Sequence, residues 1–522
     1  MSPRVHRAIV ALSTMMATFL VMLDVTIANV ALDHMRGTLS AAVDEITWVL
    51  TSFLVANAIS LPITGWLTDL LGRKRLFIVA TVAFTVTSAA AGAAPSLAFI
   101  VLARFLQGLA GGPLVPLAQA TMIETFPPRQ RGMAMAVWGI GIMFAPIIGP
   151  TLGGWVTDNW SWRWVFYINV PVGIAAVALA WLFLPESKAE RPAVRRVDVP
   201  GLALLVIGVS ALQFVLDRGQ REDWFASSAI VWLAVAAAVA LVALVVRELR
   251  ADEPVVDLRV LRHPTFAVAT AAMFVVSIAF YGIMVLSPLF TQILMGYTAM
   301  LAGLVLAPGG VSTLVTMPVA GALMSRIDPR WIIATGVALN AYAMYLMATL
   351  TLEASYWQIM LPRLIQGFGI GLSFVPLSTV ALGAVPLREL GHASGLFNFL
   401  RTVGGSVGIA AVATFLQRGA QVHQARLSAH MSLYDPDVWD RHQALIATFA
   451  ARGADPATAE LQAWASLYET VQRQALSLSF IDNFWWLSWI FLAVIPFVLF
   501  LGRGQRPGET PADVERPAMI VE

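Results

Sequence analysis

The segment Leu102-Ala-Arg-Phe-Leu-Gln-Gly-Leu-Ala-Gly-Gly112 decides the fold, because it recurs 259 residues later as Leu361-Pro-Arg-Leu-Ile-Gln-Gly-Phe-Gly-Ile-Gly371. The two copies share a leucine, an arginine, a glutamine and two glycines at identical spacing. The same shift, continued without a gap, also matches Pro127, Arg129, Gly132 and Gly149 with Pro386, Arg388, Gly391 and Gly408. Apolar helices can resemble one another by chance, but chance rarely repeats arginines and a Pro-x-Arg sequence at the same spacing. The chain is therefore predicted to contain two related halves.

The composition places these halves in lipid. Of 522 residues, 58% are hydrophobic and 12% are charged, and the mean hydropathy is +0.75. Soluble domains are nearer to half apolar and a quarter charged. A chain this apolar has too few polar side chains to cover a surface in water, so an ordinary cytosolic enzyme is excluded.

Apolar runs of about 20 residues are long enough to cross a bilayer as helices. Fourteen are predicted, near 8–32, 47–67, 76–94, 97–123, 132–156, 164–184, 199–216, 226–246, 266–290, 299–323, 331–351, 357–383, 393–416 and 479–501. The repeat relates spans four and five to spans twelve and thirteen, so the order is six, two, six. The predicted fold class is an all-α polytopic membrane protein with fourteen spans. The predicted parts are a first half (1–190), a two-helix insert (191–262), a second half (263–503) and a tail (504–522).

The distribution of positive charge predicts the orientation. Arginine and lysine concentrate in alternate connecting segments, whereas the short segments on the opposite side carry only Arg36, Arg163, Arg218 and Arg221. Basic residues favour the cytoplasmic side. Both termini are therefore expected in the cytoplasm.

The energy source is predicted from residues and motifs that the chain lacks. The chain has no cysteine, and its only lysines are Lys74 and Lys188, preceded by Arg73 and Ser187. A phosphate-binding loop requires Gly-Lys-Ser/Thr. We expect no cofactor, no metal and no ATP site, and uphill work would then depend on an ion gradient or another subunit. The net charge is only +2, because basic and acidic residues are nearly equal in number, so the composition gives no sign of nucleic-acid binding.

Five motifs follow one another along the first half. They are Leu23-Asp24-Val-Thr-Ile-Ala-Asn29-Val-Ala-Leu32, Gly65-Trp-Leu-Thr-Asp69-Leu-Leu-Gly72-Arg73-Lys-Arg75, Arg104-Phe-Leu-Gln107-Gly108, Gly149-Pro150-Thr-Leu-Gly153-Gly154 and Trp162-Arg163-Trp-Val-Phe-Tyr-Ile-Asn169-Val-Pro171. Together they resemble the major facilitator superfamily, and within it the fourteen-span drug:proton antiporters of the EmrB/QacA type, the EmrB side in particular. The resemblance covers about residues 8 to 502. Each glycine motif alone is weak, but their shared order is specific.

The resemblance implies a proton-coupled multidrug efflux transporter in a bacterial inner membrane. Its substrates would be lipophilic toxic compounds, and alternating access of the two halves would export them. It also implies a periplasmic adaptor and an outer-membrane channel as partners. The polar segment 417–474, with helical stretches at 439–449 and 457–471, would be their docking surface or simply a solvated cap.

Asp24 and Arg104 are the candidates for proton coupling. Asp24 lies about 16 residues into the first span, roughly 24 Å deep at the helical rise. A charged residue there costs about 2.5–3.5 kcal/mol on the insertion scale, and such residues are functional by default. Arg104 enters from the opposite side to a similar depth. Both are expected to face the inside of the first half, either as a proton site or as a structural ion pair. The resemblance implies the coupling role for Arg104.

Two further motifs have both a functional and a structural interpretation. Gly65, Asp69, Gly72 and Arg73 are implied by the resemblance to form a conformational latch, but turn formation and charge anchoring explain them too. Gly149, Pro150, Gly153 and Gly154 are implied to be an export motif, although close helix packing needs the same residue types. Glu124 is expected to be solvated near a span end.

Five more residues are candidates for the cavity or for coupling: Asn29, Gln107, Arg363, Arg401 and Asp482. The ninth span has no acidic residue, so Arg363 meets no equivalent of Asp24. Proton handling is therefore expected in the first half alone.

Two other functions remain open on the sequence. A carrier for one metabolite on the same fold would share most of these features. A membrane-embedded lipid-modifying enzyme would need a cluster of nucleophilic or metal-binding residues at one membrane face, and the seven histidines are scattered.

Overall fold

The computed structural model describes residues 2–184, 198–432 and 434–501, and the regular structure in these ranges is helical throughout. The boundary predicted at 190/191 and the tail 504–522 lie outside the described residues.

The first half comprises α1 (Pro3–Leu39), α2 (Val43–Ile46), α3 (Trp48–Ser60), α4 (Thr64–Leu71), α5 (Arg73–Gly92), α6 (Leu97–Gly111), α7 (Leu114–Thr125), α8 (Pro128–Asn159), α9 (Trp164–Tyr167) and α10 (Asn169–Phe183). Next come α11 (Val199–Arg218), η1 (Trp224–Ala226), α12 (Ser228–Arg250) and η2 (Leu258–Arg262). The second half comprises α13 (Pro264–Leu289), η3 (Phe290–Leu294), α14 (Ala299–Leu323), α15 (Pro329–Ala348), α16 (Tyr356–Gly383), η4 (Leu387–Glu389), α17 (Leu390–Ala429), α18 (Pro436–Ala451) and α19 (Pro456–Leu499).

The all-α polytopic fold class is confirmed. Within the described ranges, twelve helices are long and apolar enough to cross a membrane, and there are thirteen if α3 and α4, bent by 63°, count as one span. The predicted span 132–156 corresponds to α8, which has 32 residues but is not in that set. The number fourteen therefore stays a prediction. Helices suit this environment because their backbone groups are hydrogen-bonded within each segment.

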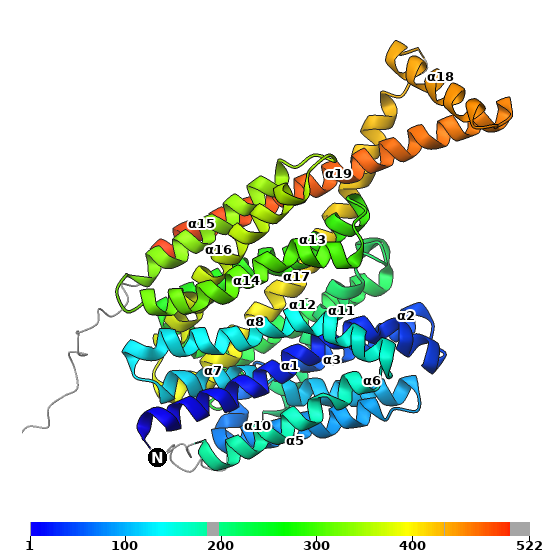
Figure 1. The fold of residues 1–522 in the computed structure, drawn as a ribbon. Coiled ribbons are helices and arrows are strands. Elements are labelled where there is room, and N and C mark those ends of the chain that lie inside the picture. Colours follow the sequence, from blue (N-terminus) through cyan, green and yellow to red (C-terminus); the bar gives the residue numbers. More distant parts are fainter. Residues whose placement is uncertain (1, 185–197, 433, 502–522) are drawn as a thin grey trace, which may run out of the picture.

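The sequence repeat is also a repeat of packing. In the first half α1 packs on α8 and α10, α6 on α3 and α5, and α10 on α5. In the second half α13 packs on α17 and α19, α16 on α14 and α15, and α19 on α15. These are the same helix pairs in the same order along each half. Figure 1 shows the two bundles, blue to cyan and green to red, lying against each other.

The helices between the halves form a pair. Helices α11 and α12 pack on each other, and α11 also contacts α3 of the first half and α17 of the second. This pair therefore lies along one side of the seam between the bundles.

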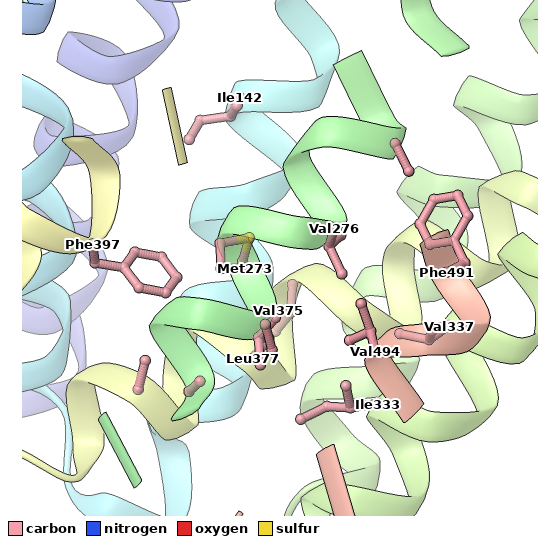
Figure 2. Packing of buried hydrophobic residues seen from close by; sticks show 14 of the residues in the cluster. Ile142, Met273, Val276, Ile333, Val337, Val375, Leu377, Phe397, Phe491 and Val494 are labelled. Atoms are coloured by element: carbon pink, nitrogen blue, oxygen red, sulfur yellow. The ribbon is translucent and has the colours of Figure 1, made fainter. Parts of the chain in front are cut away.

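The largest apolar core crosses the seam. Figure 2 shows its side chains converging from α8, α13, α15, α16, α17 and α19. Ile142 of α8 belongs to this core together with Val276 of α13 and Val375 of α16. The halves are therefore held together by apolar packing as well as by the chain that connects them.

Small residues allow a close approach between the halves near the start of α8 and the end of α14. A Cβ atom on Gly321 would lie 2.7 Å from the carbonyl oxygen of Gly132. Farther along this seam, the Asn398 amide of α17 donates to Gln119 Oε1 of α7 at 2.5 Å. The seam is therefore closed at the end of the bundle where α1 begins.

Two helices continue far beyond the bundle. Helices α17 and α19 have 40 and 44 residues, which at the helical rise is about 60 and 66 Å, twice the thickness of a hydrocarbon core. With α18, which packs on α19, they form the projecting hairpin in Figure 1. The predicted helical stretches in 417–474 are confirmed. The stretch 439–449 lies in the separate helix α18, whereas 457–471 is the first part of α19, which continues into the membrane bundle.

Closure of this seam predicts the effect of one substitution. Gly321→Trp should hold the halves apart at the end where α1 begins, because an indole cannot fit against the Gly132 backbone. Spin labels on Arg129→Cys and Arg326→Cys should then separate by several ångströms in pulsed electron paramagnetic resonance. The natural chain has no cysteine to interfere.

Gly303→Trp is the matched control on the same helix, because nothing lies within 4 Å of a Cβ atom there. Equal label distances in both variants would show that the Gly132–Gly321 contact does not set the separation of the halves.

Candidate functional site

A buried polar cluster lies inside the first half, around Asp24 of α1. Its four side chains are at most 1% exposed: Asp24, Arg104, Gln107 and Asn169. Arg104 Nη1 donates to Asp24 Oδ2. Asp24 Oδ1 accepts from Gln107 Nε2 at 2.9 Å and from Asn169 Nδ2 at 2.8 Å. One carboxylate thus accepts hydrogen bonds from two other helices, α6 and α10.

The helices position the cluster through their periodicity. Arg104 and Gln107 are three residues apart on α6, so they share a face, and Arg104 Nη1 also donates to Gln107 Oε1 at 2.7 Å. Arg104 Nε donates to the carbonyl of Val49 at 3.1 Å, and its guanidinium lies 4.2 Å from the ring centre of Phe53. The arginine is therefore fixed by α3 as well as by the carboxylate.

Asn169 connects the cluster to α5. Its Nδ2 also donates to Ser88 Oγ at 3.0 Å, and Ser88 donates to the carbonyl of Phe166 at 2.9 Å. Asn169 was not among the predicted site residues. Its position could have indicated its role, because a polar amide at the start of an apolar span needs a hydrogen-bond partner.

The ion pair is stable only while both charges are present. Removing one partner of a buried pair costs about 3–5 kcal/mol, because it leaves an uncompensated charge. A proton on Asp24 would remove the negative charge that Arg104, Gln107 and Asn169 together bind. Loss of that charge would weaken the contacts of α1 with both α6 and α10.

The predicted latch residues divide into two contacts at the closed end of the seam. Asp69 Oδ2 lies 3.0 Å from His392 Nε2 of α17, so this contact joins the halves. Arg73 pairs with Glu124 of α7, a contact within the first half. Glu124 is exposed, as expected, but its ion pair with the basic start of α5 was not predicted. His392 was not predicted, since it is 323 residues from Asp69.

The two glycines of the predicted latch, Gly65 and Gly72, are required for different structural reasons. A Cβ atom on Gly65 would lie 2.4 Å from the His392 ring, so glycine is needed for α4 to reach α17. Gly72 has φ +79° between α4 and α5, a conformation that other residues rarely adopt.

The glycines of the predicted export motif pack α8 against α1. A Cβ atom on Gly149 would lie 2.2 Å from Thr26 Oγ1, and one on Gly153 would lie 3.3 Å from the Ile27 carbonyl. Gly154 has more room, 3.9 Å from Val30. The side chain of Pro150 lies outside the described residues. The motif thus sets the distance between the helix that carries Asp24 and its neighbour.

A cavity of about 420 Å³ lies between the halves. Its wall on α1 includes Val21, Met22 and Val25, next to the face that carries Asp24. Arg363 of α16 and Arg401 of α17 line the opposite half. The cavity therefore combines an apolar wall on α1 with two arginines from the second half.

The remaining candidates lie elsewhere. Gln107 belongs to the buried cluster and not to the cavity lining. Asn29 is exposed one turn beyond Val25 and is not among the lining residues, because α1 carries it past the cavity. Asp482 lies on α19 with its side chain 53% exposed, 2.7 Å from His423 Nε2, so it belongs to the hairpin base and not to the cavity.

Charged groups that could hold a metal are dispersed. Among the residues that the structure describes, no three His, Asp or Glu side chains lie close enough to bind a metal ion.

Comparison with known proteins gives consistent matches. The family model of the Major Facilitator Superfamily matches residues 14–409. Multidrug export protein EmrB of Haemophilus influenzae is 41% identical over 433 residues, 82% of this chain and 84% of that protein. Multidrug export protein EmrB of Escherichia coli K12 is 37% identical over 499 residues, 94% of each chain. The solved structure of the proton:xylose symporter XylE has a TM-score of 0.62 over 96% of this chain and 97% of that chain, at 13% identity, which shows a shared fold.

The hydrogen bond from Asn169 to Asp24 predicts a coupling energy. Asn169→Leu should lower the free energy of unfolding by about 1–3 kcal/mol, because the buried carboxylate loses a donor. In the background of Asp24→Asn the same change should cost less, because the charge that needed the donor is gone. A double-mutant cycle on thermal unfolding in detergent measures the difference. Equal losses in both backgrounds would mean that the two side chains act independently.

Proposed function

We propose that this chain, which belongs to the major facilitator superfamily, is a proton-coupled exporter of lipophilic toxic compounds that works by alternating access. The resemblance predicted from the motifs is confirmed by the matches. The observation that carries the proposal is the buried cluster of Asp24 and Arg104 beside a cavity between two packed halves. A buried acid supplies a proton site, and an adjacent cavity supplies a place for the exported compound.

The cavity suits apolar compounds of drug size. Its volume of about 420 Å³ lies within the usual range for small-molecule sites, about 300–1,000 Å³. The lining includes Met22, Met273, Met284, Phe53 and Phe280. Methionine and aromatic side chains adapt to ligands of different shapes, which supports a broad range of substrates.

The packing of the seam supports alternating access. Its closed end carries Arg73, Lys74 and Arg75, and the positive-inside rule would place this end in the cytoplasm. In this arrangement the described state has its cytoplasmic side closed. Opening there would need the Asp69–His392 contact and the Gly132–Gly321 approach to separate.

Helix α1 supplies the link between proton and substrate. It carries Asp24 on its buried face and Val21, Met22 and Val25 on its cavity face. A proton on Asp24 would weaken the pairing with Arg104 and free α1 to shift against α6. The same shift would change the cavity wall, so proton binding and substrate binding would bias the same helix.

The proton gradient is then the energy source, with no cofactor and no ATP site. The only lysine in the described part of the chain, Lys74, follows Arg73 on α5 and has no phosphate-binding loop around it. Direction and location follow from the relatives and from the charge distribution. The protein would lie in a bacterial inner membrane with both termini in the cytoplasm.

The hairpin is the proposed contact with a periplasmic adaptor, which would lead to an outer-membrane channel. Five large apolar or aromatic side chains are between 47% and 98% exposed on it: Val422, Tyr434, Trp439, Leu461 and Tyr468. Exposed groups of this kind on a projecting element are typical of protein interfaces.

The proton role is tested by Asp24→Asn. Asparagine keeps the size of the side chain but cannot release a proton, so drug-dependent proton movement in inverted membrane vesicles should be abolished while drug binding remains. Asp158→Asn, a side chain 71% exposed on α8, is the matched control and should retain coupling. Full proton-driven export by Asp24→Asn would contradict the proposed role.

The adaptor contact is tested by shortening the hairpin. Helices α17 and α19 remain paired through His423 and Asp482, 2.7 Å apart, so residues 426–472 are replaced by a short glycine–serine turn. Drug resistance of cells should be lost while transport in inverted vesicles is kept, because the membrane bundle is untouched. Leu461→Glu, at a position 71% exposed, should weaken resistance in the same way without affecting folding. Resistance that survives both changes would show that the hairpin docks no partner needed for export.

A further inference from the structure

The two halves contain related arginine–glutamine pairs in different surroundings. Arg104 and Gln107 of α6 correspond through the repeat to Arg363 and Gln366 of α16. In each half the arginine Nη1 donates to the glutamine Oε1 three residues later. The arrangement of the pair is thus repeated together with the sequence.

The acid of the first half has no counterpart in the second. Arg104 Nη1 donates to the carboxylate of Asp24, whereas Arg363 Nη1 donates to the hydroxyl of Ser287 at 2.9 Å. A hydroxyl leaves the charge of the guanidinium uncompensated. Within the part of the chain that the structure describes, Arg363 has no ion pair, and its buried Nε donates to no acceptor.

The second pair also opens onto the cavity. Arg363 and Gln366 both line it, whereas Arg104 and Gln107 do not. An uncompensated arginine is therefore presented to whatever enters the space between the halves.

A second arginine adds to this charge. Arg401 of α17 lines the same cavity, is 7% exposed, and makes no hydrogen bond or ion pair to any described residue. Its guanidinium lies 5.7 Å from the centroid of the Phe374 ring. A buried guanidinium with donors unused is unfavourable unless an acceptor from outside the chain binds it.

The cavity as a whole is positive. Among the described residues that line it, the charged ones are Arg363, Arg401 and Asp217. Asp217 lies on α11 and accepts from Thr51 Oγ1 at 3.0 Å, so this acid is bound to the first half. The remaining lining is mostly apolar. A ligand that matches such a site has an apolar body and one negative group.

We propose that Arg363 and Arg401 bind the acidic group of an amphipathic organic anion, such as a carboxylate on an aromatic body. The carboxylate of the ligand occupies in the second half the place that Asp24 occupies in the first. Guanidinium suits this role because its planar donors match a carboxylate in two parallel hydrogen bonds. The inference rests on the proposed export function, for which it names a substrate class.

The test compares a carboxylate with its neutral amide. The full chain is placed in nanodiscs of zwitterionic phosphatidylcholine, so that no anionic lipid competes. Binding of 1-naphthaleneacetate and 1-naphthaleneacetamide is measured by calorimetry at pH 7 without a proton gradient. The carboxylate should bind about tenfold tighter or more, which is the strength expected of charge-assisted hydrogen bonds.

Two variants should remove this preference by different routes. Arg363→Gln takes away the positive charge, and Ser287→Asp supplies a fixed carboxylate that pairs with Arg363 in the manner of Asp24. Each should weaken binding of the acid about tenfold and leave binding of the amide unchanged, which also reports that the variant folds. Arg401→Gln should weaken the acid in the same direction, and Arg363→Lys should restore part of the preference.

Arg326→Gln, an exposed position at the closed end of the seam, is the control for a general loss of positive charge and should keep the preference. An acid that binds no tighter than the amide to the natural chain would overturn the inference, as would an unchanged preference in both Arg363→Gln and Ser287→Asp. If one of these variants binds neither probe, the other decides alone. Failure of proton-coupled export in vesicles would contradict the proposed function, whereas this binding experiment uses no gradient and stands apart from it.

Discussion

A charged side chain inside a membrane bundle needs a partner, and Asp24 and Arg104, both at most 1% exposed, meet that need by pairing with each other. The pair joins α1 to α6, and Asn169 extends it to α10. Because α1 also packs on α8 through Gly149, the ion pair is connected through α1 to four helices of the first half. A change in its charge therefore acts on the whole half.

The duplication explains how one fold separates two tasks. Both halves keep the arginine and the glutamine of the repeat, and both pack their helices in the same pairs. Only the first half adds an acid, and it encloses the resulting ion pair. The second half leaves its arginine facing the cavity, where a ligand reaches it. A proton site and a ligand site thus arise from the same arrangement through the presence or absence of one carboxylate.

The seam between the halves combines apolar packing with a few specific contacts. The core in Figure 2 supplies the general attraction, which does not depend on an exact position. The contacts Gly132–Gly321 and Asp69–His392 need close approach and define one closed arrangement. Such a seam can open at one end while the halves remain associated through the rest of the core.

The sequence by itself determined the helices, the duplication, and the depth of Asp24 and Arg104, because hydropathy and helical rise are local properties that can be counted along the chain. It also located the helical stretches of the hairpin. Only the tertiary structure decided which way each side chain faces. An apolar helix is hydrophobic all round, so periodicity does not say which side meets a cavity, a neighbour or lipid. For this reason Asn169 and His392 were not predicted as partners, and Asn29, a candidate for the cavity, lies outside its lining.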